Sequence, residues 1–313
     1  MRRSGETRSF SAQPNILATT AEQGISELMV DLYRTVPRPL SAKMLFGWHR
    51  MVTLGRTDIH DIGRFRTSPR PMQIVSGASY DRKIHFEAPP SSRVTSEMEG
   101  FVDWFNRSGP NGSETLPALT RAGLAHLRFE CVHPFEDGNG RVGRAIAKKA
   151  LVQGFHPASP LIALAATILA HQRSYYDALE AANKANDATQ WLVWFAAIAI
   201  EAQQRAADQV EFLIDKTKLL DRLRGKINAR QEKAILRIME EGPQGFRGGL
   251  SAGNYSTITG ASPSTSTRDL AELVELNALV RSGELRHTRY ALHLPLHPVV
   301  SLHIDQAGNL LDR

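Results

Sequence analysis

The stretch His133-Pro-Phe-Glu-Asp-Gly-Asn-Gly-Arg-Val-Gly-Arg144 brings a base, two acids, a glycine-rich turn and two arginines together in one short segment. Pro134 and the glycines would interrupt a β-strand, and an apolar helical pattern resumes only at Val142. The segment is therefore predicted to be a loop that runs into the N-terminus of a helix. Such a junction binds anions, because unpaired N–H groups and the positive end of the helix dipole point toward the ligand.

The residue types of this segment predict nucleotide phosphate chemistry. His133 titrates near neutrality and could take a proton from an attacking hydroxyl. Asp137 is a hard oxygen ligand suited to Mg²⁺, and Gly138 and Gly140 would let the backbone approach phosphate. The Asn139 amide can donate to a phosphate oxygen, and Arg141 and Arg144 present planar guanidinium groups to the remaining phosphates. Any one of these residues alone would more often be a solvated surface residue. The complete set at this spacing favours function.

The segment resembles the signature of the Fic (Fido) family, and it matches that signature at every specified position. The resemblance implies transfer of a nucleoside monophosphate, usually AMP from Mg·ATP, to a hydroxyl of a target protein. His133 would be the general base and Asp137 the metal ligand. Gly138, Asn139 and Gly140 would form the anion-binding turn, with Arg141 and Arg144 as the triphosphate clamps. A phosphotransferase branch of the family has lysine where Gly140 stands, so the glycine favours nucleotidyl transfer.

The resemblance extends over residues 40–205, because further short motifs follow in the order seen in Fic domains. These are Leu45-Phe-Gly-Trp-His-Arg50, Gly63-Arg-Phe-Arg66, the apolar pairs at 74–75 and 84–86, and Pro89-Pro90. In the family the 74–86 region is a hairpin flap that holds the target backbone by strand addition. Without the neighbouring motif, an ordinary surface hairpin would be the better interpretation.

Composition is typical of a soluble, cytoplasmic enzyme. The chain has 313 residues, 42% of them apolar, and no apolar run approaches the roughly 18 residues that a membrane span needs. The N-terminus is charged without an apolar segment behind it, which argues against a secretory signal. The single cysteine, Cys131, lies in an apolar context that suits a buried thiol better than a nucleophile.

The periodicity of apolar residues, and the Gly and Pro clusters that interrupt it, divide the chain into five parts. They are an N-terminal tail with a lead-in helix (1–39), the Fic domain (40–205), a connecting helix (206–227), a winged-helix-like domain (228–296) and a C-terminal tail (297–313). The predicted fold is therefore mainly α, a Fic-type helical bundle with a small β-hairpin flap, followed by a winged helix-turn-helix.

The winged-helix prediction comes from residues 262–293. Ser262 is placed to cap a helix with Pro263 at its first position and polar residues ahead of Leu270, which is a recognition-helix layout. Two short β-like stretches follow at 279–281 and 289–293, as in a wing. Residues 216–313 carry 14 Lys and Arg against 10 Asp and Glu, so charge favours DNA as a partner only weakly. Dimerisation or target docking are the alternatives for this domain.

Regulation is the least determined part of the prediction. Many Fic proteins carry an inhibitory helix with Ser or Thr, three residues, Glu, and Gly or Asn, and Thr95 to Gly100 fits that pattern with Glu99 as the glutamate. This match follows the flap, where the family does not place the helix, so we interpret it as a chance match on a surface helix. The chain would then be unrestrained, controlled by a separate antitoxin-like polypeptide, or shortened at its N-terminus. Two other functions stay open: a nucleotide-sensing DNA-binding regulator, and hydrolytic removal of AMP from a modified protein.

Overall fold

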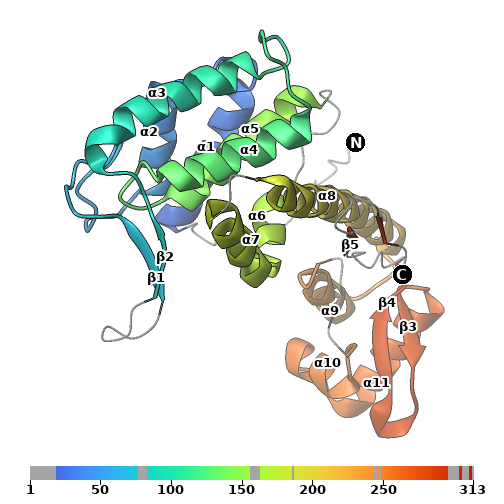
Figure 1. Cartoon of the computed structure of the whole chain (residues 1–313). Helices are drawn as coiled ribbons and strands as arrows, with labels where there is room; N and C mark the ends of the chain where they lie inside the picture. The colour runs from blue at the N-terminus through green and yellow to red at the C-terminus, as the bar shows by residue number, and fades with distance from the viewer. Residues whose placement is uncertain are drawn as a thin grey trace, which may run out of the picture. The chain divides into compact units, whose positions relative to one another are not determined.

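The computed structural model describes residues 19–76, 83–155, 163–184, 187–242, 246, 248–294, 303–304 and 310–311 (Figure 1). The chain forms two compact units. The first comprises residues 1–158 and 177–192, and the second comprises residues 159–176 and 193–313. No helix in the described ranges combines the length and the apolar character that a membrane span requires.

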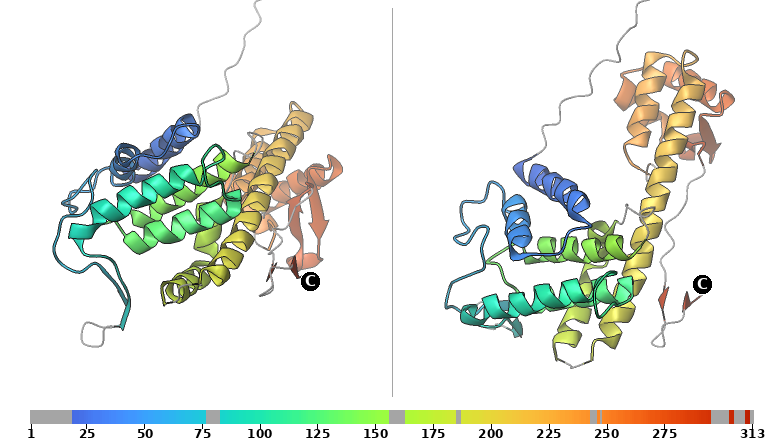
Figure 2. Two further views of the ribbon diagram at one scale, coloured as in Figure 1. Left: turned by 45° about the horizontal axis from the view of Figure 1, so that its top comes forward. Right: turned by 90° about the horizontal axis from the view of Figure 1, so that it is seen from above.

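The first unit is built from helices packed around an aromatic core. In chain order they are α1 (Thr20–Thr35), α2 (Ala42–Val52), α3 (Ser91–Arg107), α4 (Ala118–Val132) and α5 (Asn139–Gly154). Helices α4 and α5 lie side by side and run antiparallel, because Gly154 at the end of α5 meets Ala118 at the start of α4 (Figure 2). Trp48, Phe101 and Phe129 are completely buried among these helices, so the hydrophobic effect holds the bundle together.

Two of these helices begin or end differently from the sequence prediction. Helix α5 begins at Asn139, three residues before the apolar pattern that starts at Val142. The first turn of a helix needs no apolar face when its N–H groups point to solvent or to a ligand, so periodicity missed it. Helix α3 begins directly after Pro90, before the surface helix expected at 95–100.

The predicted flap is an antiparallel hairpin. Strands β1 (Gln73–Ser76) and β2 (Lys83–Glu87) pair with Gln73 opposite Glu87 and Ile74 opposite Phe86, and the register shifts between Ile74 and Val75. The turn at 77–82 lies outside the described residues. At the base of the hairpin the Ala88 N–H donates to the Met72 carbonyl (2.9 Å).

The second unit contains helix α6 (Leu164–Ala170) and most of the 35-residue helix α8 (Thr189–Leu223). Helix α7 (Gln172–Lys184) contributes residues to both units. The sequence predicted a separate connecting helix at 206–227. The structure instead continues α8 through most of this segment without a break, since its polar residues do not stop a helix.

We call residues 229–292 the C-terminal module. It consists of α9 (Ala229–Met239), α10 (Ala252–Thr259), α11 (Pro263–Glu275) and the antiparallel strands β3 (Leu279–Ser282) and β4 (Arg289–Leu292). The capping prediction for α11 is confirmed, because Ser262 caps this helix with Pro263 in the first turn. Asn228 caps α9. A 3₁₀ turn, Leu285–His287, lies between β3 and β4. Farther along the chain, β5 (His303–Ile304) pairs with β6 (Leu310–Leu311).

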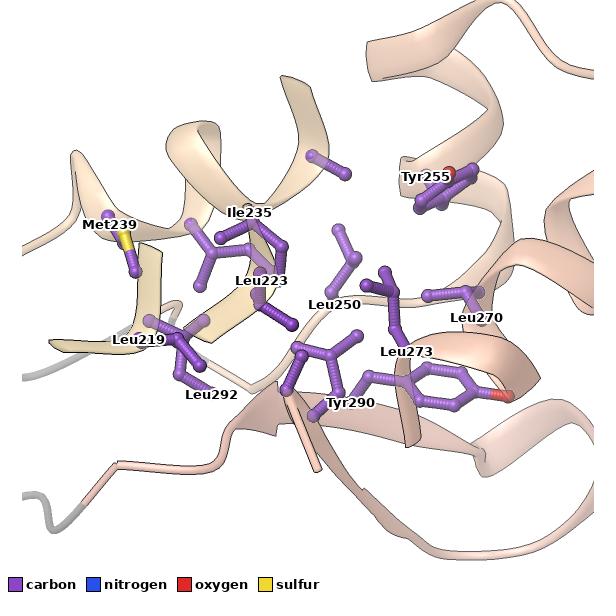
Figure 3. Packing of buried hydrophobic residues seen from close by; sticks show 14 of the residues in the cluster. Leu219, Leu223, Ile235, Met239, Leu250, Tyr255, Leu270, Leu273, Tyr290 and Leu292 are labelled. Carbon is purple, nitrogen blue, oxygen red and sulfur yellow. The ribbon is translucent and has the colours of Figure 1, made fainter. Parts of the chain in front are cut away.

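The module closes around its own apolar core together with the end of α8. Ile235 of α9, Tyr255 of α10, Leu270 and Leu273 of α11 and Leu292 of β4 point into one cluster with Leu219 and Leu223 (Figure 3). The Leu250 N–H also donates to the Tyr290 carbonyl (2.8 Å), which ties the segment before α10 to β4.

Candidate active site

The site begins where α4 ends, at a backbone conformation that non-glycine residues seldom adopt. His133 is the C-cap residue of α4 with φ 47° and ψ 59°, and its N–H donates to the Phe129 carbonyl (2.9 Å). The buried Arg66 holds this turn: its Nε donates to the His133 carbonyl (2.8 Å) and its Nη2 to the Pro89 carbonyl (2.5 Å). The Gly63-Arg-Phe-Arg66 motif therefore locks the end of α4 to the base of the flap.

The His133 side chain is oriented as a general base would need. Its Nδ1 lies 3.3 Å from the main-chain oxygen of Glu130, which can only accept, so Nδ1 carries the proton in this contact and Nε2 keeps its lone pair. Burial lowers the pKa of His133, and the Arg66 charge lowers it further, against the contacts to Glu130 and Asp137 that raise it. The imidazole is therefore neutral at physiological pH.

The loop between the two helices is held internally by Asn139. Its Oδ1 accepts from the Phe135 N–H (2.9 Å), its Nδ2 donates to the Phe135 carbonyl (2.8 Å), and the side chain is buried. The Asn139 amide oxygen and one of its two amide N–H groups are therefore engaged with Phe135, and donation to a phosphate by the other N–H stays a prediction. Asn139 closes the loop and leaves its backbone N–H at the first turn of α5.

A second histidine supports the loop from α2. The buried His49 accepts the Gly63 N–H at Nδ1 (2.9 Å), so Nε2 carries the proton and donates to the Asp137 carbonyl (3.0 Å). Its ring stacks on Phe135 with centroids 4.0 Å apart. Burial lowers the pKa of His49, which keeps this ring neutral. His49 is thus a structural residue of the site rather than a second base.

Asp137 presents a carboxylate at the mouth of the loop. Its Oδ1 accepts from the Gly138 N–H (2.5 Å), and its Oδ2 accepts from Arg56 Nη1 (2.7 Å). Burial raises the pKa of Asp137, but these two donors outweigh it and the pKa is lowered. The group is therefore ionised, partly exposed and suited to a hard cation. Within the described ranges no three His, Cys, Asp or Glu side chains form a metal-binding cluster.

The glycines allow a ligand to approach the start of α5. Gly138 has φ 83° and caps the helix, and a Cβ there would lie 3.1 Å from Val52. At Gly140 a Cβ would lie 3.2 Å from Arg144 Nη1, so the Arg144 guanidinium reaches back over the first turn. In the first turn of α5 the Arg141 N–H already donates to the Gly138 carbonyl (3.1 Å), and the N–H groups of Asn139 and Gly140 precede it.

The two motif arginines are held differently. Arg141 Nη1 donates to the Val52 carbonyl at the end of α2 (2.5 Å), and its Nη2 lies 3.9 Å from Asp137 Oδ2. Arg144 donates no hydrogen bond to any residue that the structure describes. Arg141 is therefore oriented by the protein, whereas the Arg144 donors are not engaged with the described residues.

The structure thus brings every motif residue of the sequence prediction to the junction of α4 and α5. Sequence reasoning missed the role of Arg56, which faces Asp137, and that of Glu130, whose side chain lies beneath Gly143. Arg56 lies outside any motif, so the sequence offered no signal for it. Glu130 lies three residues before His133, on the same side of α4, which was the available signal.

Two further expectations concern residues near the motif. Glu99 is exposed on α3, as predicted for a chance match to the inhibitory pattern. Cys131 donates to Asn183 Oδ1 (2.7 Å), and burial raises the pKa of its thiol to about 11. A protonated, hydrogen-bonded thiol is a poor nucleophile, in agreement with its assignment as a packing residue.

Comparison with known proteins identifies the family. Residues 39–151 match the Fic/DOC family model. The chain is 31% identical over 135 residues to the protein adenylyltransferase fic-1 of Caenorhabditis elegans, an alignment that covers 43% of this chain and 22% of that protein. It is 32% identical over 146 residues to the protein adenylyltransferase Fic of Drosophila willistoni, covering 46% of this chain and 25% of that protein.

A solved Fic family protein from Desulfovibrio desulfuricans G20 aligns over 88% of this chain and 77% of its own, with 22% identity and a TM-score of 0.46. The aligned part of the chain spans about a quarter of the length of the curated relatives. The family match contains the whole segment from His133 to Arg144. Residues 39–151 of this chain are therefore a domain of the Fic/DOC family.

Proposed function

We propose that this chain is a protein adenylyltransferase, which transfers AMP from Mg·ATP to a hydroxyl side chain of a target protein. The observation that carries the proposal is the assembly of a neutral imidazole, an ionised carboxylate and two guanidinium groups around one helix N-terminus. The names of the relatives, which are protein adenylyltransferases, support the same reaction.

In this reaction the oxygen of a Ser, Thr or Tyr hydroxyl attacks the α-phosphorus. His133 Nε2 takes the hydroxyl proton, a phosphodiester forms between target and AMP, and pyrophosphate leaves with its bond to the α-phosphorus broken. The hydrogen bond from Nδ1 to the Glu130 carbonyl keeps Nε2 as the accepting nitrogen and stabilises the imidazolium that results.

The phosphates would be held by the start of α5. Its first-turn N–H groups and the guanidinium groups of Arg141 and Arg144 can share the negative charge of the triphosphate. Mg²⁺ would neutralise phosphate charge, and Asp137 is the residue that would hold it, since Mg²⁺ in nucleotide sites takes one or two carboxylates plus phosphate oxygens. The single ionised carboxylate fits that requirement, with Arg56 as the competitor for its Oδ2.

The hairpin β1–β2 would present the target. A strand of the target that pairs with the hairpin edge would place one hydroxyl near the α-phosphate without reading the target's side chains closely. Arg66 bonds both the carbonyl of Pro89, at the foot of this hairpin, and the carbonyl of His133. The general base and a target strand paired with the hairpin would therefore keep a fixed relative position.

A labelling experiment tests the proposal. The purified protein is incubated with Mg²⁺, a cell lysate and ATP labelled at either the α- or the γ-phosphate. We expect protein bands labelled from the α-phosphate alone, and none with His133→Ala. Label from the γ-phosphate would show phosphate transfer instead, and no label from either would contradict transfer.

The hydrolytic alternative is less well supported. In the family, removal of AMP depends on a glutamate of the inhibitory helix that positions water. The pattern at 95–100 lies on α3 with Glu99 exposed, which is not the environment of a residue that orders a catalytic water. A nucleotide-sensing regulator would not need the oriented base at His133.

A second candidate function belongs to the C-terminal module, which we interpret as a winged helix that contacts duplex DNA. Ser264, Thr267 and Arg268 are exposed along one face of α11. Beside this face lies a pocket of about 550 Å³ whose polar lining includes Ser251, Thr267, Arg281, Thr288 and Arg289. Two arginines and several hydroxyls form a setting that suits a backbone phosphate.

Fluorescence anisotropy with a labelled duplex of mixed sequence would test this candidate. Arg281→Ala removes one charge from the pocket, and Lys233→Ala on the exposed side of α9 removes an equal charge elsewhere. We expect Arg281→Ala to weaken binding and to reduce the salt slope by about one, with Lys233→Ala unchanged. Equal effects of the two variants, or no binding by the wild type, would contradict a DNA site here.

A further inference from the structure

The side-chain carboxyl of Glu130 is buried near the proposed phosphate site, and the reaction described above uses only the main-chain carbonyl of this residue. The Glu130 Oε1 atom is inaccessible to solvent and makes no hydrogen bond within the described structure. A buried oxygen without a partner costs free energy, so such an atom in a native fold calls for an explanation.

The packing of α4 against α5 makes room for this carboxyl. A Cβ on Gly143 would lie 2.4 Å from Glu130 Oε1, so any other residue at that position would force the carboxyl to move. Gly143 is the residue before Arg144, and the Arg144 charge is the group that favours ionisation of Glu130. The acid and the arginine therefore act on each other across the helix contact, without an ion pair between them.

Arg144 is also the guanidinium that keeps its donors free of the described residues. Its Nη1 reaches back toward Gly140, at the turn where phosphate would bind. A phosphate bound there would share the positive charge that now acts on Glu130. The carboxylate would lose the stabilising effect of the Arg144 charge and would face added negative charge.

We propose that Glu130 is a positioning residue for Arg144, and that it takes up a proton from solvent when nucleotide phosphates bind to that arginine. The inference rests on the proposed function, since it assigns the nucleotide to this site. Protonation converts the carboxylate to a neutral acid and leaves the arginine charge to the phosphates.

The ionisation properties of the surroundings support this assignment. Burial raises the pKa of Glu130 to about 7, although the Arg144 charge lowers it, so the group can change its protonation at physiological pH. Two other titratable groups lie near it on α4. Burial lowers the pKa of His126 to about 4, and burial together with the Glu130 charge raises the pKa of Cys131 to about 11. Neither changes charge between pH 6.5 and pH 8.5, and the lowered pKa of His133 keeps its imidazole mainly neutral in that range.

The test is calorimetry of Mg·ATP binding at pH 7.5 in two buffers that differ in ionisation enthalpy, which counts protons taken up. All proteins carry His133→Ala, which stops transfer and removes any contribution of this imidazole to proton uptake. If binding raises the pKa of Glu130 by one unit, linkage predicts uptake of roughly half a proton and roughly five-fold tighter binding at pH 6.5 than at pH 8.5. Adding Glu130→Gln should abolish both effects.

Two further variants distinguish proton uptake by Glu130 from a general effect of substitution on the structure. Gly143→Ala pushes a methyl group toward Oε1 and should also reduce proton uptake. Glu99→Gln makes the same chemical change on the exposed side of α3 and should leave uptake unchanged. Equal uptake with and without Glu130→Gln, while Mg·ATP still binds, would overturn the inference alone. No binding of Mg·ATP by His133→Ala would contradict the proposed function, and the inference with it.

Discussion

Asp269 and Glu130 are two acids near an arginine, but they differ in their hydrogen-bond partners and in the direction of their pKa shifts. In the C-terminal module Asp269 is buried, and its carboxylate accepts from Arg230 Nε (2.9 Å) and Nη2 (3.2 Å) and from the Tyr255 hydroxyl (2.9 Å). In the Fic domain a buried oxygen of Glu130 has no hydrogen-bond partner among the described residues, and Arg144 donates no hydrogen bond to them. The pKa of Asp269 is lowered, since its donors outweigh burial, whereas that of Glu130 is raised.

The difference separates an acid that holds a fold together from one placed near a ligand site. Asp269 of α11 bonds residues of both α9 and α10, so its hydrogen bonds stabilise the packing of these three helices. Glu130 and Arg144 leave bonding capacity unused, which a folded protein retains where a ligand completes the arrangement. The following predictions test this contrast, from the largest expected effect to the smallest.

Replacing His133 by Ala should reduce target labelling by about 10²–10⁴-fold, because the variant lacks the general base. Nucleotide affinity should be nearly unchanged, since the base acts on the hydroxyl. In the wild type, the acid limb of the rate profile should lie below the ordinary imidazole pKa, because burial lowers the pKa of His133. Labelling and calorimetry check this, and labelling by His133→Ala at the wild-type rate would show that another group is the base.

Replacing Arg144 by Ala should weaken Mg·ATP binding by about 1.5–3 kcal/mol, the usual contribution of a hydrogen bond to a charged group. Arg107→Ala, a surface arginine of α3 that pairs with Asp103, is the matched control and should bind as the wild type does. Calorimetry measures both. Unchanged affinity in Arg144→Ala would remove this arginine from the phosphate site.

Replacing Asp269 by Ala should destabilise the C-terminal module by about 1–3 kcal/mol, because the Tyr255 hydroxyl loses its partner in the core. Asp269 has a lowered pKa, so its contribution is present above the ordinary aspartate value and is lost as pH falls through the folded-state pKa. Hydrogen exchange of peptides from 229–292 measures the change, with the exposed Glu275→Ala on the same helix as control. Equal protection in both variants would mean that the Asp269 network adds nothing.

Replacing Glu99 by Gly should change self-labelling little. Glu99 is exposed on α3, and an exposed carboxylate contributes at most about 1 kcal/mol to any ion pair. The readout is autoadenylylation with α-labelled ATP. An increase of roughly ten-fold, equivalent to about 1.4 kcal/mol, would place the regulatory glutamate on α3 after all.

The sequence by itself determined the parts of this protein that depend on local chemistry. The segment from His133 to Arg144 predicted an anion-binding junction, and α5 begins within it. Ser262 with Pro263 predicted the start of α11, and the apolar pairs flanking a turn predicted the β1–β2 hairpin. Caps, glycines and β-branched pairs act over a few residues, so their effect can be read without knowing the fold.

Only the tertiary structure decided which polar groups are already in use. The loop folds so that the Asn139 amide already bonds Phe135 through its oxygen and one N–H, which residue type alone did not predict. Arg56 reaches Asp137 across 81 positions of sequence, and Glu130 acquires its raised pKa from the packing of α5. Hydrogen-bond partners and desolvation depend on which segments meet in space, and residue type and spacing carry no record of that.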